Sequence, residues 1–204
     1  MRLFTAVVPP GLQLEELSAA VARLRAEVPG ADALRWTRPA GWHYTLSFLG
    51  EVDEGLVPEL TERFGRGARR SVPFRIGIRG GGHFGQGVLW AGAAGSGEDL
   101  AAMRRLAERV HAGARRAGVA VEEPFRFTPH LTLARTRRGR GPGAAPAAGL
   151  GEYAAGLDVF TGTAWQVTDF ALIRSHPPSG GEDSWYETLA TWSLGAAGSG
   201  DGAG

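Results

Sequence analysis

Along this chain, apolar positions alternate between the spacing of β-strands and the spacing of α-helices. A continuous apolar run near the N-terminus predicts a buried strand, and apolar residues from Leu14 to Val28 recur every three or four positions, as on one face of a helix. The elements expected in the first half are, in chain order, a strand over 3–8, a helix over 14–28, a strand over 42–49, a helix over 56–64 and a strand over 74–78. Asp53 is placed to cap the second of these helices.

The second half of the chain repeats this order. The elements expected there are a strand over 88–90, a helix over 100–110 that Ser96 and Asp99 could cap, a strand from 127, a weaker helix over 147–155, and strands over 165–174 and 185–194. The distance from the first strand to the motif described below is similar in both halves, from 3 to 43 and from 88 to 130. Because a duplicated unit produces such matched spacing, we expect one bilobal domain over 1–194, with units of roughly 1–80 and 87–194.

Glycine-rich segments interrupt the pattern. Residues 80–87 and 139–149 are expected to be mobile, and the tail over 195–204 is expected to be flexible because it has few apolar residues. Gly80, Gly82 and Gly85 match the spacing of a dinucleotide-binding loop. Since that segment lies between two expected strands and opens no helix, a hairpin loop is predicted instead.

The residue types present exclude several kinds of chemistry. The chain has no cysteine, which removes thiol nucleophiles, disulfides and thiolate metal sites. It has no lysine either, so Schiff-base catalysis and the lysine-dependent Walker phosphate loop are excluded. A net charge of +1 gives no overall attraction to nucleic acid, so binding of phosphate would need a local basic cluster.

The N-terminal sequence matches neither a signal peptide nor a membrane segment. Pro9-Pro10 follows Met1 to Val8 directly, and no apolar run approaches the ~20 residues of a membrane span. With the absence of cysteine, this pattern leads us to expect a cytoplasmic protein that has no membrane partner.

One four-residue pattern occurs twice, as His43-Tyr44-Thr45-Leu46 and as His130-Leu131-Thr132-Leu133. Alternate residues of a strand share a face, so each copy should present an imidazole beside a hydroxyl while its other two residues face the core. Two such strands could therefore supply two histidines and two hydroxyls to one cleft. The alternative is a pair of strand histidines that only pack or hydrogen-bond locally.

The remaining histidines carry less information. His83, His111 and His176 lack a threonine two places on and lack partners at metal-ligand spacing. Surface or loop positions are therefore expected for all of them, with His111 on the exposed side of its helix.

A basic cluster and several aromatic residues are candidates for substrate contacts. The cluster follows the second motif, could hold an anionic substrate, and consists of Arg135, Arg137, Arg138 and Arg140. Strict alternation along a strand points Arg135 away from His130, so only twist or a strand end could bring it round. Most aromatic residues are expected in the core, but one near the cleft could stack on a base; the candidates are Tyr44, Phe48, Trp90, Phe125 and Phe127.

Two histidines without a metal-ligand set suit acid–base catalysis in which one imidazole starts neutral and the other charged. In an in-line attack on phosphorus, one group accepts a proton from the nucleophile and the opposite group donates one to the leaving oxygen. Thr45 and Thr132 could then hold the non-bridging oxygens, where negative charge develops. Phosphodiester chemistry that needs no metal and no cofactor is the function these residues favour.

The two motifs resemble those of the two-histidine phosphoesterase superfamily, and their surroundings resemble the bacterial and archaeal RNA 2′,3′-cyclic phosphodiesterases, historically called 2′-5′ RNA ligases. The segments that carry this resemblance are 43–52, 88–92 and 129–135, with the N-terminal Met1-Arg2-Leu3-Phe4, Arg174-Ser175 and Tyr186-Glu187. It runs from Met1 to about Leu194, and Tyr44 is a mild departure at a position that is more often aliphatic. The loop after Arg140, which is rich in Gly, Pro and Ala, is a second departure from the family pattern.

The resemblance implies an α+β fold of two pseudo-symmetric lobes, each a mainly antiparallel sheet with helices on its outer face, and an active-site cleft between them. It also implies hydrolysis of a terminal 2′,3′-cyclic phosphate on RNA to a 2′-phosphomonoester. His43 would be the proton donor and His130 the proton acceptor, while Thr45, Thr132 and Arg135 would contact phosphate or nucleotide. The expected partners are RNA ends or small cyclic nucleotides, and a monomer is expected.

Other activities share the same motifs. A relative could act on another small cyclic or 2′-5′-linked nucleotide, or could ligate RNA ends through a 2′-5′ bond. A third alternative is a nucleotide- or RNA-binding module that keeps the cleft without turnover, although binding alone does not need a matched acid and base.

Overall fold

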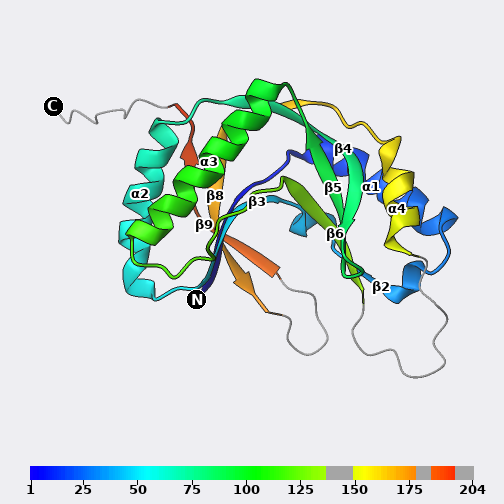
Figure 1. The fold of residues 1–204 in the computed structure, drawn as a ribbon, viewed down its shortest axis with the longest axis horizontal. Helices are drawn as coiled ribbons and strands as arrows, with labels where there is room; N and C mark the ends of the chain where they lie inside the picture. Colours follow the sequence, from blue (N-terminus) through cyan, green and yellow to red (C-terminus); the bar gives the residue numbers. More distant parts are fainter. Residues whose placement is uncertain (137–148, 178–184, 196–204) are drawn as a thin grey trace.

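The computed structural model describes residues 1–136, 149–177 and 185–195 (Figure 1). Its strands are β1 (Arg2–Val7), β2 (Leu34–Trp36), β3 (Tyr44–Glu51), β4 (Phe74–Phe84), β5 (Val88–Ala94), β6 (His130–Thr136), β7 (Trp165–Val167), β8 (Asp169–His176) and β9 (Trp185–Ser193). Its α-helices are α1 (Gly11–Glu27), α2 (Val57–Arg69), α3 (Gly97–Arg116) and α4 (Leu150–Asp158), and its short 3-10 helices are η1 (Ala31–Ala33), η2 (Pro39–Gly41) and η3 (Glu54–Leu56).

The described strands form one strongly curved sheet in which neighbours run antiparallel. Their spatial order is β7-β4-β5-β6-β3-β1-β8-β9, and β2 also pairs with β6. This order is preserved when β3 exchanges with β6, β1 with β5, β8 with β4 and β9 with β7, so the two halves of the sheet are related by a pseudo-twofold axis between β3 and β6. The expected α+β fold with two pseudo-symmetric, mainly antiparallel lobes is confirmed.

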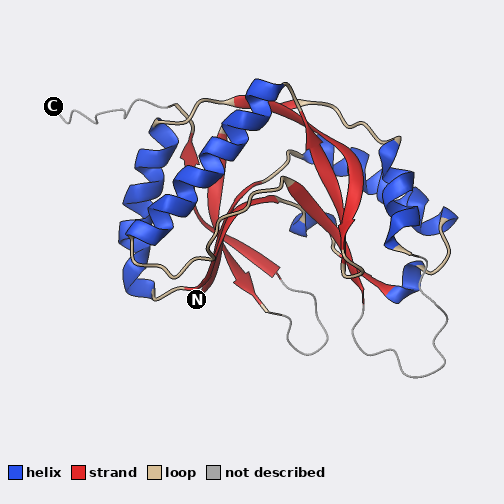
Figure 2. Ribbon diagram, viewed as in Figure 1, coloured by secondary structure: helices blue, strands red, loops and turns tan. Residues whose placement is uncertain are grey.

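Helices cover the outer side of each lobe (Figures 1 and 2). On one lobe α3 packs against β3 and α2 against β9, while on the other α4 packs against β4 and β5, with α1 beside it. Each lobe combines elements from both ends of the chain, because β8 and β9 join β1 and β3, whereas α1 and β4 join β5 and β6. The lobes therefore do not coincide with the units 1–80 and 87–194.

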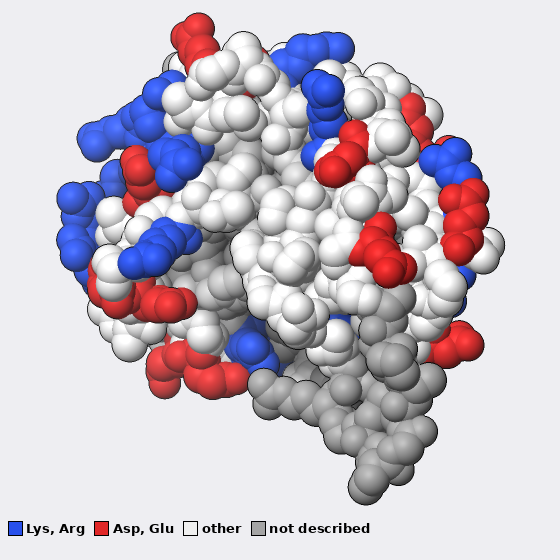
Figure 3. Space-filling view, turned by 45° about the vertical axis from the view of Figure 1, so that its right-hand side comes forward, with Lys and Arg blue, Asp and Glu red and all other residues white. Residues whose placement is uncertain are grey.

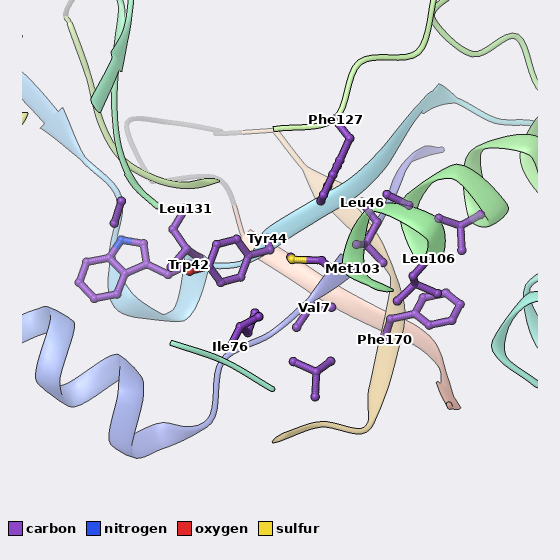
Figure 4. Close-up of a cluster of buried hydrophobic side chains, with 14 of the residues drawn as sticks. Val7, Trp42, Tyr44, Leu46, Ile76, Met103, Leu106, Phe127, Leu131 and Phe170 are labelled. Atoms are coloured by element: carbon purple, nitrogen blue, oxygen red, sulfur yellow. The ribbon is translucent and has the colours of Figure 1, made fainter. Parts of the chain in front are cut away.

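The core lies between the sheet and the helices (Figure 4). Tyr44 and Leu131, the second residues of the two motifs, are both fully buried and pair with each other across β3 and β6. Burial of each such side chain contributes about 1.5–3 kcal/mol relative to exposure. The Tyr44 hydroxyl donates a 2.8 Å hydrogen bond to the Gly92 carbonyl, so a tyrosine is accommodated at this apolar position.

One of the two predicted helix caps lies at the start of its α-helix, and the other lies one short turn earlier. Ser96 and Asp99 form a capping box at the start of α3. Asp53 accepts a hydrogen bond from the Gly55 backbone N–H and so caps η3, the turn that leads into α2, instead of α2 itself.

Several boundaries differ from the predicted ones. β4 continues to Phe84, so Gly80 and Gly82 lie within a strand, and only the end of the predicted loop forms the hairpin turn. A Cβ atom at Gly82 would collide with the Trp90 ring, which explains why the strand keeps glycine there. The second motif strand begins at His130, and α4 begins at Leu150. Most of 139–149 and of the tail over 195–204 falls outside the described residues.

No helix in the described ranges is both long and apolar enough to span a membrane.

Candidate active site

A cleft of about 980 Å³ lies at the junction of the two lobes. Every residue predicted for the site lines it, namely His43, Thr45, His130, Thr132 and Arg135. The cleft wall is basic, since it includes Arg2, Arg35, Arg38 and Arg135 and no Asp or Glu among the described residues. On the face shown in Figure 3, groups of both charges lie around a largely uncharged area.

The register of β3 with β6 crosses the two motifs. Tyr44 pairs with Leu131, and continuing this antiparallel register by one residue sets His43 opposite Thr132 and Thr45 opposite His130. Residues directly opposite each other on neighbouring strands have Cβ atoms about 4.5–5.5 Å apart. Each imidazole therefore has a hydroxyl of the other motif as its cross-strand neighbour.

Backbone contacts orient both imidazoles. His130 Nδ1 lies 2.7 Å from the Thr128 carbonyl oxygen, and since a carbonyl can only accept, Nδ1 carries the proton and Nε2 is the unprotonated nitrogen of the neutral ring. The ring of His43 interacts in the same way with the backbone of Gly41, also two residues earlier. The two histidines thus share one local arrangement.

Aromatic side chains hold the rings from the sides. His43 stacks on Phe4 with a centroid distance of 4.6 Å, and the edge of Tyr186 approaches it at 5.3 Å. Phe84 meets His130 edge to face at 4.9 Å. This apolar packing limits the rotation of both imidazoles and lowers the polarity around them.

The same surroundings shift both histidines toward the neutral form. The pKa of His43 is lowered to about 4, mainly by burial and to a smaller extent by His130, against the opposing effect of the hydrogen bond to the Gly41 backbone. The pKa of His130 is also below its ordinary value, mainly because of burial and also because of Arg135, against the effect of the hydrogen bond to Thr128. In the free protein near neutral pH, both imidazoles are therefore uncharged.

Arg135 faces the cleft because β6 contains a β-bulge. The pairing of β5 with β6 changes register at this point, with the partners Leu89 and Ala134 on one side and Trp90 and Thr132 on the other. Leu133 is therefore an additional residue, and after it the alternation of faces changes phase. Strict alternation would point Arg135 away from His130, and this bulge, instead of the twist or strand end that was expected, brings both residues to the cleft wall.

A matching bulge lies on β3. Its pairing with β1 shifts at Leu46, between the pairs Thr5–Ser47 and Ala6–Thr45. Phe48 consequently faces the cleft and is 61% exposed, five residues after His43 as Arg135 is five residues after His130.

Phe48 lines the cleft, whereas the other aromatic candidates do not. Tyr44 and Phe127 are in the core, Phe125 stacks on His111 at 4.2 Å, and Trp90 contacts the ring of His130 at 6.4 Å. Further aromatic residues of the wall were not among the sequence candidates; they are Phe4, Trp36, Trp185 and Tyr186. They come from strands whose own patterns carried no sign of the cleft.

The prediction for His111 is wrong. It is buried, shares a 3.0 Å hydrogen bond with Ser47 and lies 3.3 Å from a carboxylate oxygen of Glu123. Its position four residues after Ala107 continues the apolar stripe of α3, which is the signal that could have placed it inside.

His83 and His176 are not among the residues that line the cleft. His83 contacts the Gly85 carbonyl, and His176 stacks on Trp185 and pairs with Glu187. Arg137, Arg138 and Arg140 lie outside the described residues. Within the described ranges, no three His, Asp or Glu side chains come together as a potential metal site.

Comparisons with known proteins give a consistent result. A family model described as LigT like phosphoesterase matches residues 12–90. The RNA 2′,3′-cyclic phosphodiesterase of Thermus thermophilus is 34% identical over 185 residues, which cover 86% of this chain and 82% of that protein. The crystal structure of TT0787 from the same species superimposes with a TM-score of 0.69 and 32% identity, over 97% of this chain and 100% of that one. E. coli LigT complexed with 3′-AMP gives a TM-score of 0.68 at 25% identity, over 95% and 97% of the two chains.

Proposed function

The chain belongs to the LigT-like phosphoesterase family, and from this premise we propose that it hydrolyses the terminal 2′,3′-cyclic phosphate of RNA to a 2′-phosphomonoester, using two histidines and no metal ion. The relative from T. thermophilus is named RNA 2′,3′-cyclic phosphodiesterase, which supports the substrate in this proposal. The observation that carries the proposal is the crossed pairing of the two motifs through Tyr44 and Leu131, which sets two imidazoles and two hydroxyls in one basic cleft.

Acid and base work on opposite sides of the phosphorus. His130 accepts a proton from water as the water oxygen bonds to phosphorus, and the bond to the 3′ oxygen breaks. His43 donates a proton to that oxygen, which leaves a free 3′ hydroxyl and a 2′-phosphate. The hydroxyls of Thr45 and Thr132 donate to the non-bridging oxygens, where negative charge increases in the transition state.

The substrate itself supplies part of the required protonation. His43 must be charged to act as the acid, yet its pKa of about 4 keeps it neutral in the free enzyme. An anionic phosphate within about 4–6 Å favours the charged form and raises such a pKa. Protonation of His43 is therefore coupled to the arrival of the phosphate.

Phe48 is the residue that fits the base of the terminal nucleotide. It presents an exposed aromatic face on the lobe opposite to Arg135, in the same cleft as the histidines. Stacking of a base on such a face contributes ~1–3 kcal/mol and tolerates any base. A nucleotide with its cyclic phosphate between the histidines and its base on Phe48 would contact both lobes of the cleft.

The experiment that tests this function uses an oligoribonucleotide ending in a 2′,3′-cyclic phosphate, incubated with the purified protein in EDTA. We expect a 2′-phosphate product, and we expect His43→Ala and His130→Ala each to lower turnover by at least ~10²-fold. His83→Ala, which removes an exposed histidine outside the motifs, is the matched control. A 3′-phosphate product, a requirement for a divalent ion, or full activity in both variants would each contradict the proposal. Nucleotide binding without turnover in the parent protein would indicate a binding module.

A further inference from the structure

Two arginines occupy directly opposed positions on the cleft wall. Arg35 of β2 and Arg135 of β6 are paired residues of antiparallel strands, so their side chains leave the sheet on the same face. Both are exposed, and both line the cleft.

This pair is unfavourable in the protein alone. Like charges directly opposite each other across a strand pair destabilise a sheet. Neither arginine forms an ion pair within the described part of the chain, and no described cleft residue is acidic. Arg35 also borders a smaller pocket of about 480 Å³ that includes Asp32, but no ion pair joins the two. An anion held by both guanidinium groups would remove the repulsion.

The position of the pair separates it from the reacting phosphate. Because Leu133 is an additional bulge residue, Arg135 lies two pairing positions beyond Thr132 along β6, about 7 Å at the strand rise of ~3.3 Å per residue. Arg35 lies on the three-residue strand β2, which pairs with β6. A phosphate between His43 and His130 therefore leaves room for another phosphate at the arginine pair.

We propose that Arg35 and Arg135 form a second phosphate site, which binds a backbone phosphate of the RNA on the 5′ side of the terminal cyclic phosphate. This inference rests on the proposed function and adds a substrate class to it. The enzyme then recognises an RNA strand by two phosphates at a fixed separation, and it prefers oligonucleotides to cyclic mononucleotides.

The test compares two substrates with the same terminal nucleotide, a pentaribonucleotide ending in a 2′,3′-cyclic phosphate and the corresponding 2′,3′-cyclic mononucleotide. The measured quantity is the ratio of their kcat/KM values. We expect Arg35→Ala to lower this ratio by ~10-fold or more, as for loss of one charge-assisted contact. We also expect the log–log slope of kcat/KM against salt concentration, measured with the pentanucleotide, to be less steep by about 0.7 in Arg35→Ala. Arg35→Lys should retain part of the preference, because it keeps the charge and loses the fork of donors.

Arg105→Ala is the control, since it removes an exposed arginine of α3 that does not line the cleft. An unchanged ratio in Arg35→Ala overturns the inference, including the case in which both substrates lose activity equally, because Arg35 would then act on the reacting phosphate. If the parent protein turns over neither substrate, the proposed function fails. In that case, the ratio of the two binding affinities can be measured instead, for a pentanucleotide and a mononucleotide that both end in a 2′-phosphate. Equal effects of Arg35→Ala on those affinities would overturn the second site separately.

Discussion

Phe48 and Arg135 occupy equivalent positions on the two motif strands, five residues after His43 and His130, and a bulge on each strand turns them into the cleft. One is aromatic and the other is cationic. The pseudo-twofold axis therefore relates the two histidines and the two threonines of the motifs while the walls around them differ. Under the proposed function, this difference would give a nucleotide one orientation between the lobes.

We expect Phe48→Ala to raise KM for a 2′,3′-cyclic mononucleotide by ~5- to 100-fold with a smaller effect on kcat, because base stacking contributes ~1–3 kcal/mol. Phe48→Tyr should retain most of the affinity. Steady-state kinetics with all four bases measure this, with Val159→Ala as the control at an apolar residue that is 80% exposed outside the cleft. An unchanged KM in Phe48→Ala would remove this residue from base binding.

The pH dependence of catalysis follows from the lowered pKa values. Catalysis needs one neutral and one charged imidazole, and kcat/KM reports the free enzyme. Since the pKa is about 4 for His43 and below 6.5 for His130, the maximum of kcat/KM should lie below pH 6.5. The bound phosphate raises both pKa values, so the maximum of kcat should lie at higher pH. Complete pH profiles test this, and a kcat/KM maximum above pH 7 would refute it.

His43 should also make stability depend on pH. Its pKa is about 4 in the folded protein and about 6.5 in an unfolded chain, so the unfolded state binds the proton first as the pH falls. This contribution is fully present above pH 6.5 and is lost as the pH falls toward 4, by at most about 3 kcal/mol. Urea unfolding of the parent and of His43→Asn between pH 7 and 4.5 measures it. The free energy of unfolding should fall more steeply with decreasing pH in the parent than in His43→Asn, and parallel curves would exclude the effect.

Replacing either threonine by valine should lower kcat by ~10- to 10²-fold, less than loss of a histidine, since a hydrogen bond to a charged group contributes ~1.5–3 kcal/mol. The crossed register makes a sharper prediction. In double-mutant cycles of nucleoside 2′-phosphate binding, Thr45→Val should couple more strongly to His130→Ala than to His43→Ala. Thr45→Ser serves as the control that keeps the hydroxyl. Stronger coupling within one motif would contradict the crossed arrangement.

Local patterns were sufficient for much of this molecule. The two motifs predicted their strands, their cleft and the inward direction of Tyr44 and Leu131, because alternation is a property of one strand. The orientation of Arg135 could not be predicted in this way, because the bulge exists only in the pairing of β6 with β5, a strand distant in sequence. Arg35 was missed because a strand of three residues is too short to show a period.

The mixing of elements between the lobes has a consequence for symmetry. A half-length unit could form this cleft only as a homodimer, in which the residues five places after each histidine would be identical. Joining two such units in one polypeptide allows Phe48 on one side and Arg135 on the other. Because β8, β9 and α3 complete the lobe that β1 and β3 begin, neither half of the chain can build its own core. The asymmetric site and the dependence of each half of the chain on the other therefore have a common origin in this topology.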